Sequence, residues 1–260
     1  MTKQSRFNLL ALLSILSCLS MNAQLTASQL FHYPFDGNAN DVGVNGLNGT
    51  LQNSPTFVNG HNGTPNGAIQ LNGSNQYVQL PNVAMMRPTG QPISFSFWVN
   101  PTSLNSDWKP IFSMDQAPSI WAGYWCAMTD SWLAIYFGDG GIAGPGSRRQ
   151  AAVNISLPLN SWTHVVGIIR GPTDMDIYIN CVQQSITYGG SGGALSWAGF
   201  GGAVGRSQNG SFIPGFKYFH GAIDELRFWE RELTAAEIQQ FCTTCVNDTV
   251  NIAEAICQGD

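Results

Sequence analysis

The chain has 260 residues, of which 10% are charged, and its formal net charge is −5. This acidic balance argues against a nucleic-acid partner, because such partners are bound by basic surfaces. The 29 glycines and the many asparagines supply polar turn residues in place of charges, which is typical of β-rich exported domains.

The first 24 residues have the pattern of a secretory signal peptide. Lys3 and Arg6 precede a short apolar run, and Ala23 offers a small residue before a cut. The run is too short to remain as a membrane-spanning helix, so we expect no transmembrane segment in the mature chain. A lipoprotein signal ending at Cys18 is the alternative, although Leu16 is bulky where a small residue is usual. Both signals predict a secreted or cell-surface protein, and cleavage would leave a net charge of −7.

Short strand signals recur along the chain and predict an all-β fold, a two-sheet antiparallel β-sandwich or jelly roll. The segment 92–100 alternates cleanly, with Ile93, Phe95, Phe97 and Val99 on one face. Two strand-like pieces within 67–80 surround a hairpin signal at 72–74. Further strands are predicted at 30–35, 109–113, 132–137, 161–170 and 175–180, the last two as a pair.

The segment 221–238 predicts a strand that leads into one short C-terminal helix, near 234–241. Thr234 and Glu237 have the spacing of a capping box. In the strand, Asp224 and Glu225 are adjacent, and successive side chains of a strand point to opposite faces. We therefore expect that these two carboxylates do not both face inward.

Residues 25–242 are expected to form the jelly-roll domain, and residues 243–260 a cysteine-bearing tail or the start of a following segment. Five cysteines remain after signal cleavage, and this odd number implies an unpaired thiol or a partner outside the chain. A zinc or redox role for the pair Cys242 and Cys245 lacks a second such motif, so structural disulfides are predicted. The candidates are Cys126, Cys181, Cys242, Cys245 and Cys257.

Five segments, taken in order, resemble the laminin-G-like/concanavalin A-like lectin-glucanase superfamily over about residues 30–242. They are 33–37, 68–73 with 77–78, 93–99, 161–166 followed by 176–180, and 221–238. The resemblance implies a jelly roll of two antiparallel sheets. With the signal peptide and the tail, the chain is also similar to surface proteins of gliding and adhesive bacteria. The family has glycine where this chain has Cys181, and we expect that hairpin to be pinned by a disulfide to Cys126, with a second bond among the tail cysteines.

The same resemblance implies a structural calcium ion that joins Asp36, in the first loop, to Asp224, in the closing strand. The loop 36–41 also contains Asn38 and Asp41, and such oxygen-rich side chains suit Ca²⁺. The alternative interpretation is that these residues only form turns.

Hydrolysis of a glycan would need two neighbouring carboxylates. The Glu-x-Asp-x-Glu pattern of concanavalin-like hydrolases does not occur in the sequence. The nearest pair, Asp174 and Asp176, is interpreted as a solvated hairpin end. His164 lies on an alternating strand and is interpreted as a core or surface residue, and the pair Arg148 and Arg149 as a solvated loop.

Sugar binding is the remaining chemistry, because aromatic faces stack on pyranose rings. Trp121, Tyr124, Trp125 and Trp197 are the primary candidates, since they lie in glycine-rich surroundings; Trp108, Trp132 and Tyr218 are also available. We expect a non-catalytic recognition domain that binds carbohydrate or a surface protein within an adhesin-like protein. A divergent glycoside hydrolase and a purely structural spacer are the alternatives.

Overall fold

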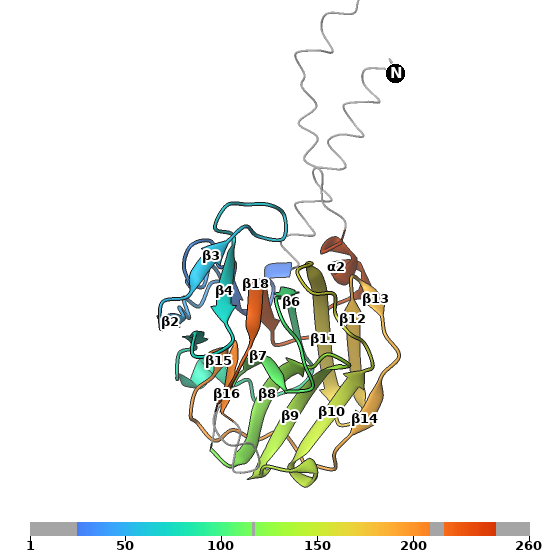
Figure 1. Ribbon diagram of the computed structural model, residues 1–260. Helices are drawn as coiled ribbons and strands as arrows, with labels where there is room; N and C mark the ends of the chain where they lie inside the picture. Colours follow the sequence, from blue (N-terminus) through green and yellow to red (C-terminus); the bar gives the residue numbers. More distant parts are fainter. Residues whose placement is uncertain (1–24, 116–117, 209–215, 243–260) are drawn as a thin grey trace, which may run out of the picture.

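The computed structural model describes residues 25–115, 118–208 and 216–242, which form a sandwich of two antiparallel eight-stranded sheets (Figure 1). The predicted signal peptide and residues 243–260 lie outside this part of the chain. Among the described residues, no helix is long and apolar enough to cross a membrane.

The first sheet runs from edge to edge through β13 (Val182–Gln183), β12 (Asp174–Ile179), β11 (Thr163–Gly171), β6 (Ile93–Pro101), β18 (His220–Trp229), β4 (Ala68–Asn72) and β3 (Thr56–Val58), and β1 (Gln29–Tyr33) also pairs with β18. The second sheet runs through β14 (Thr187–Gly189), β10 (Arg148–Val153), β9 (Leu133–Ile142), β8 (Ile120–Met128), β7 (Lys109–Ser113), β15 (Ala203–Val204), β5 (Tyr77–Gln79) and β2 (Thr50–Gln52). β16 (Arg206–Gln208) and β17 (Phe216–Tyr218) form a small separate pair. The short helices are η1 (Ala84–Met86), η2 (Pro145–Ser147) and α2 (Ala235–Gln240).

The core lies between the two sheets, and the central strand β6 shows why. Ile93, Phe95, Phe97 and Val99 are fully buried in it, which confirms the predicted alternation. The opposite face of β6 is covered as well. Its Ser94 hydroxyl accepts a hydrogen bond from the backbone N–H of Leu233 at 3.0 Å. β6 therefore has no solvent-facing side at this point.

The predicted helix is confirmed with its cap, as α2. The Thr234 hydroxyl accepts from the backbone N–H of Glu237 at 3.3 Å, and the Glu237 carboxylate accepts from the Thr234 N–H at 2.8 Å. Leu233 and Ile238 are buried in one cluster with Trp229. The helix packs beside β12 and β13 on the outer side of the first sheet (Figure 1).

The predicted 67–80 hairpin is wrong in its pairing. β4 pairs with β18 and β3 in the first sheet, whereas β5 pairs with β15 and β2 in the second. The turn signal itself is correct, because the Asn72 side-chain oxygen accepts from the backbone N–H groups of Ser74, Asn75 and Gln76. The turn redirects the chain from one sheet to the other.

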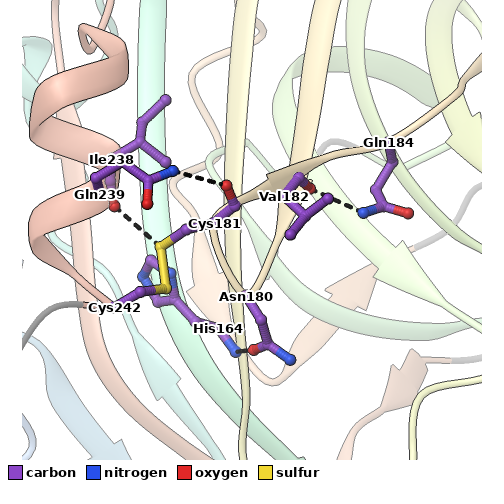
Figure 2. The surroundings of a disulfide bond; sticks show 8 residues. All are labelled: His164, Asn180, Cys181, Val182, Gln184, Ile238, Gln239 and Cys242. Atoms are coloured by element: carbon purple, nitrogen blue, oxygen red, sulfur yellow. Dashed lines mark hydrogen bonds between the residues drawn. A yellow bond between two sulfur atoms is a disulfide. The ribbon is translucent and has the colours of Figure 1, made fainter.

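The predicted disulfide between Cys126 and Cys181 is also corrected. Cys181 is bonded to Cys242 (Figure 2). Cys126 is free and fully buried. Cys126 lies in the core between the sheets, whereas Cys181 packs on the outer side of the first sheet, so the two sulfurs are in different hydrophobic clusters. Cys245 and Cys257 lie outside the described residues.

Candidate functional site

The outer face of the second sheet carries an aromatic row that the strand register creates. Trp125 on β8 lies opposite Tyr136 on β9, and Tyr136 lies opposite Gln150 on β10. Directly opposed residues of antiparallel strands share one face. The flanking Tyr124 and Phe137 form the next row and face the core instead.

Rows of small residues flank this aromatic row. Ala127, Ala134 and Ala152 lie opposite one another on one side, and Gly123 lies opposite Gly138 on the other. These residues put little or no side chain above the sheet. Larger side chains can therefore pack over these rows: Ala127 and Ala134 are fully buried, and the backbone of Trp121 lies directly over Gly138.

Further rings extend the row into a cluster. Trp121 stacks on Trp125 with ring centroids 4.9 Å apart and an angle of 18° between the planes, and Trp125 stacks on Tyr136 at 5.1 Å and 6°. Trp108 meets Trp121 edge-on at 6.1 Å. Trp125 and Tyr136 are buried as the floor, whereas Trp108, Trp121 and Trp132 are half-buried. We call these five residues the aromatic groove.

Two adjoining hollows lie beside the outer face of β10 and the segment 182–187. The first has a volume of 390 Å³ and is lined by Trp132, Tyr136, Arg148, Gln150, Ala152, Asn154 and Thr187. The second has a volume of 520 Å³ and continues past Asn154 and Thr187 along residues 182–186. Rings, amides and one guanidinium are the groups that line the first hollow. Burial raises the pKa of the Tyr136 hydroxyl, so the phenol stays protonated at neutral pH.

Arg148 and Arg149 lie on β10 and not in a solvated loop, which corrects the sequence interpretation. The Nε of Arg149 donates to the carbonyl of Gly192 at 2.6 Å, and its Nη1 donates to that of Gly190 at 3.2 Å. Arg148 lies in the groove, where its Nε donates to Gln150 Oε1 at 3.1 Å and its Cζ is 5.9 Å from the Tyr136 ring centroid. Arg149 therefore bonds the backbone of a neighbouring segment, whereas Arg148 lines the hollow.

The predicted ligand-binding aromatics divide between the groove and the core. Trp121 and Trp125 belong to the outer aromatic cluster, although neither lines a hollow. Tyr124 is fully buried between the sheets, and Trp197 packs edge-on against it at 5.8 Å, with its Nε1 donating to the Pro88 carbonyl at 3.0 Å. The expectation of an exposed ring is therefore corrected for Tyr124 and Trp125, which are buried, whereas Trp197 is half-buried, as Trp121 is.

The sequence reasoning missed Tyr136 and misplaced Arg148. The signal that would have found Tyr136 is the alternation of β9, in which Ala134 and Tyr136 share the face opposite to Leu133, Ile135 and Phe137.

A second cluster surrounds the carboxylates of β18. The strand has an irregular register between Asp224 and Arg227, and Glu225 has a φ of 54°. Because Ile223 and Leu226 both face the core, this bulge places Asp224 and Glu225 away from it, and the simple alternation assumed from sequence does not hold there.

Both carboxylates of the bulge have partners. Asp224 Oδ2 lies 2.6 Å from His61 Nδ1 and accepts from the His61 backbone N–H at 2.9 Å. Glu225 Oε2 lies 2.5 Å from His32 Nε2 and 2.5 Å from an Arg227 nitrogen. Burial by itself raises the pKa of Glu225, but the bond from His32 and the charge of Arg227 outweigh it and lower this pKa to about 2.

The four residues predicted to bind calcium fit a cation in part. Desolvation and the negative charges of Glu225 and Asp224 raise the pKa of Asp36, which shows carboxylates gathered near this exposed loop. Asp41, however, uses both oxygens to accept from the backbone N–H groups of 32, 43 and 47, and the Asn38 amide oxygen accepts from the N–H of Asn40. A calcium ion here would be held by the carboxylates of Asp36 and Asp224.

A separate group has ligand atoms close enough for a metal. In the described part of the chain, the only three His, Cys, Asp or Glu side chains whose ligand atoms all lie within 4.8 Å of one another are His164, Cys181 and Cys242. Two of these form the disulfide beside α2, and Figure 2 shows His164 next to it. The disulfide ties up both sulfurs.

The carboxylate pair considered for hydrolysis belongs to an ion-pair network. Arg170 contacts Asp174 at 2.9 Å, Asp176 at 2.6 Å and Glu232 at 2.7 Å. His164, considered as a base, is 1% exposed and packs against Trp98 and Phe241. Burial, with the charges of Arg227 and His61, lowers its pKa to about 3, so it is neutral at pH 7.

The fold and the groove together define a β-sandwich domain of the jelly-roll class with an aromatic surface on one sheet. Residues 72–239 match the Laminin_G_3 family, described as the concanavalin A-like lectin/glucanases superfamily, and the chain belongs to this family. No curated protein matches the sequence.

Solved structures agree on the fold at low sequence identity. Domain 4 of AbnA, an extracellular arabinanase of Geobacillus stearothermophilus solved with arabinotriose, has a TM-score of 0.59 at 20% identity, over 83% of this chain and 98% of that one. The binding domain of botulinum neurotoxin DC, solved with SialylT, has a TM-score of 0.60 at 12% identity, over 84% of this chain and 51% of that one. The binding domain of Paraclostridial Mosquitocidal Protein 1 has a TM-score of 0.59 at 14% identity, over 84% and 52%. The chain thus spans about half of the two toxin binding domains.

Proposed function

We propose that the domain is an exported, non-catalytic module that binds carbohydrate in the aromatic groove of the second sheet. The observation that carries the proposal is the stack Trp121–Trp125–Tyr136, with the half-buried Trp132 beside a 390 Å³ hollow. Flat rings beside amide groups suit a sugar, because the rings cover its apolar faces and the amides bond its hydroxyls.

The groove favours a glycan over a protein surface as the partner. Its two hollows share Asn154 and Thr187, so they adjoin and extend from β10 towards residues 182–187. The second hollow adds Gln183, Gln184 and Ser185, which are hydrogen-bonding side chains without charge. An extended chain of several sugar units matches this shape. Comparable domains solved with arabinotriose or SialylT support a binding role for the fold.

The wider setting is part of the same proposal. The predicted signal peptide and the disulfide Cys181–Cys242 fit a protein that works outside the cytoplasm. A groove on an exported domain would attach its parent protein to a polysaccharide or a cell surface, which is the role of an adhesin-like protein.

The test is binding of the purified protein to a glycan array, followed by titration calorimetry with each hit. We expect micromolar binding, and we expect Trp132→Ala to weaken it by about tenfold, since one ring face is lost. Trp132→Phe should retain part of the affinity.

Phe200 provides a matched control. It is 56% exposed and lines neither hollow, so Phe200→Ala should leave affinity unchanged. Absence of binding to any glycan would support the spacer alternative, and binding that is insensitive to Trp132→Ala would move the site away from the groove.

A further inference from the structure

We infer that the groove selects acidic glycans, with the guanidinium of Arg148 binding a carboxylate on a uronate or sialate unit. This inference rests on the proposed function and deepens it, because it names the class of sugar. The starting observation is that, among the residues that the structure describes, Arg148 is the only charged one that lines either hollow.

The side chain of Arg148 is held in place without being neutralised. Its Nε donates to Gln150 Oε1 at 3.1 Å. Its Cζ lies over the Tyr136 ring, 5.9 Å from the ring centroid. No described carboxylate forms an ion pair with it, and its two terminal nitrogens make no hydrogen bond to the described residues. A positioned guanidinium with a free fork matches a carboxylate in bidentate geometry.

Arg149, the next residue on β10, differs from Arg148, because its side-chain nitrogens are bonded within the protein. Arg149 lies on the other face of β10. Its side chain donates to two backbone carbonyls, so it holds the segment 190–192 against the strand. Arg148 has no such structural bond from its terminal nitrogens. The difference also makes Arg149 unsuitable as a binding residue and leaves Arg148 as the cation available to a ligand.

The negative charge of the whole chain makes the Arg148 guanidinium the place where an acidic sugar is favoured. With a net charge of −5, the full chain repels acidic polymers in general. Arg170 is already paired, with Asp174, Asp176 and Glu232. An acidic glycan therefore gains affinity where its carboxylate meets Arg148. Placement on the ring cluster would fix which sugar unit carries that carboxylate.

The experiment compares matched acidic and neutral sugars by titration calorimetry on the purified protein. The probes are tetragalacturonate against its methyl ester, sialyllactose against lactose, and glucuronoxylan oligosaccharides against plain xylo-oligosaccharides. We expect at least one acidic member to bind on the order of tenfold more tightly than its neutral partner, as a charge-assisted hydrogen bond would give. This preference should shrink as salt is raised.

Variants separate the two levels of the proposal. Arg148→Gln should remove the acidic preference, so that the two members of a pair bind equally tightly, whereas Trp132→Ala should weaken both members and keep their ratio. Equal binding of acidic and neutral members, or a preference that survives Arg148→Gln, would overturn the inference while leaving the groove as a glycan site. No binding in any pair would overturn the inference together with the proposed function.

Discussion

The imidazole of His61 contacts the carboxylate of Asp224, with Nδ1 2.6 Å from Oδ2. The two residues are 163 positions apart, and the ring of His61 also stacks on Trp98 at 4.3 Å. This contact ties the loop after β3 to the bulge in β18. Asp36 approaches the same bulge from the loop after β1, so the first and last strands of the domain meet at one charged cluster.

Calcium is predicted to stabilise this cluster. At a hundredfold excess over its Kd, an ion held by Asp36 and Asp224 would add about 2.7 kcal/mol to the free energy of unfolding. For a domain of this size the melting temperature should rise by about 5–10 °C. Thermal melts with a chelator, with Ca²⁺ and with Mg²⁺ measure this, and Ca²⁺ should act more strongly because Mg²⁺ dehydrates reluctantly.

Two variants make the calcium test specific. Asp36 is exposed, so Asp36→Asn should leave the chelated protein as stable as before and reduce the calcium response. Asp224→Asn should reduce the response and also weaken the His61 contact. Asp130→Asn, an exposed change elsewhere, is the control. Identical melting curves with chelator and with millimolar Ca²⁺ would show that these residues only form turns and hydrogen bonds.

The disulfide between Cys181 and Cys242 is predicted to contribute about 4 kcal/mol to stability, because it closes a loop with a sequence separation of 61 in the unfolded chain. The double variant Cys181→Ser/Cys242→Ser should show this loss in urea unfolding. Peptide mapping without reduction should find the 181–242 bond, and Cys126 should be alkylated only after unfolding, since burial raises its pKa and blocks access. Cys126 found in a disulfide would contradict the assignment.

The burial of His164 predicts that the protein loses stability in acid. Its folded-state pKa is about 3 and its ordinary value is 6.5, so below pH 6.5 the unfolded chain takes up a proton that the folded chain refuses. The contribution of this residue to stability is thus full above pH 6.5 and falls as pH drops towards 3, by about 3 kcal/mol at pH 4. Urea unfolding at several pH values measures it.

The variant His164→Gln should flatten this pH dependence, whereas His220→Gln should leave it unchanged, because His220 lies near the surface beside Ser103. A slope between pH 6.5 and 4 that is the same in both variants and in the parent protein would assign the effect to other groups.

The Arg170 network predicts an absence of hydrolysis at this site. Asp174 and Asp176 both bind Arg170, so neither is placed as an acid or nucleophile against a sugar. Incubation with β-glucans, galactans and xylans should release no reducing ends. Asp174→Asn should cost at most about 1 kcal/mol of stability, because Asp174 is exposed. Turnover that Asp174→Asn or Asp176→Asn abolishes would restore the hydrolase alternative.

Helix caps and buried strand faces were predictable from the sequence, because each depends on residues that are close together in the chain. The capping box of Thr234 and Glu237 depends on a three-residue spacing, and the buried row Ile93, Phe95, Phe97 and Val99 depends on the two-residue period of a strand. The strand at Lys109–Ser113 was predicted with the observed bounds. Strand β8 was not predicted, because a glycine at position 123 is typical of a loop. In the structure Gly123 lies within the strand and has a φ of 67°.

The sequence by itself determined the fold class, because alternation, turn residues and a helix cap are written in neighbouring positions. Tertiary structure alone decided which strands pair, which sulfurs meet and which rings share a face. Trp125, Tyr136 and Gln150 join one row only through the registers of β8, β9 and β10, and Cys181 reaches Cys242 only because α2 packs on the outer side of the first sheet. These relationships depend on contacts between residues far apart in the chain, and no local period encodes them.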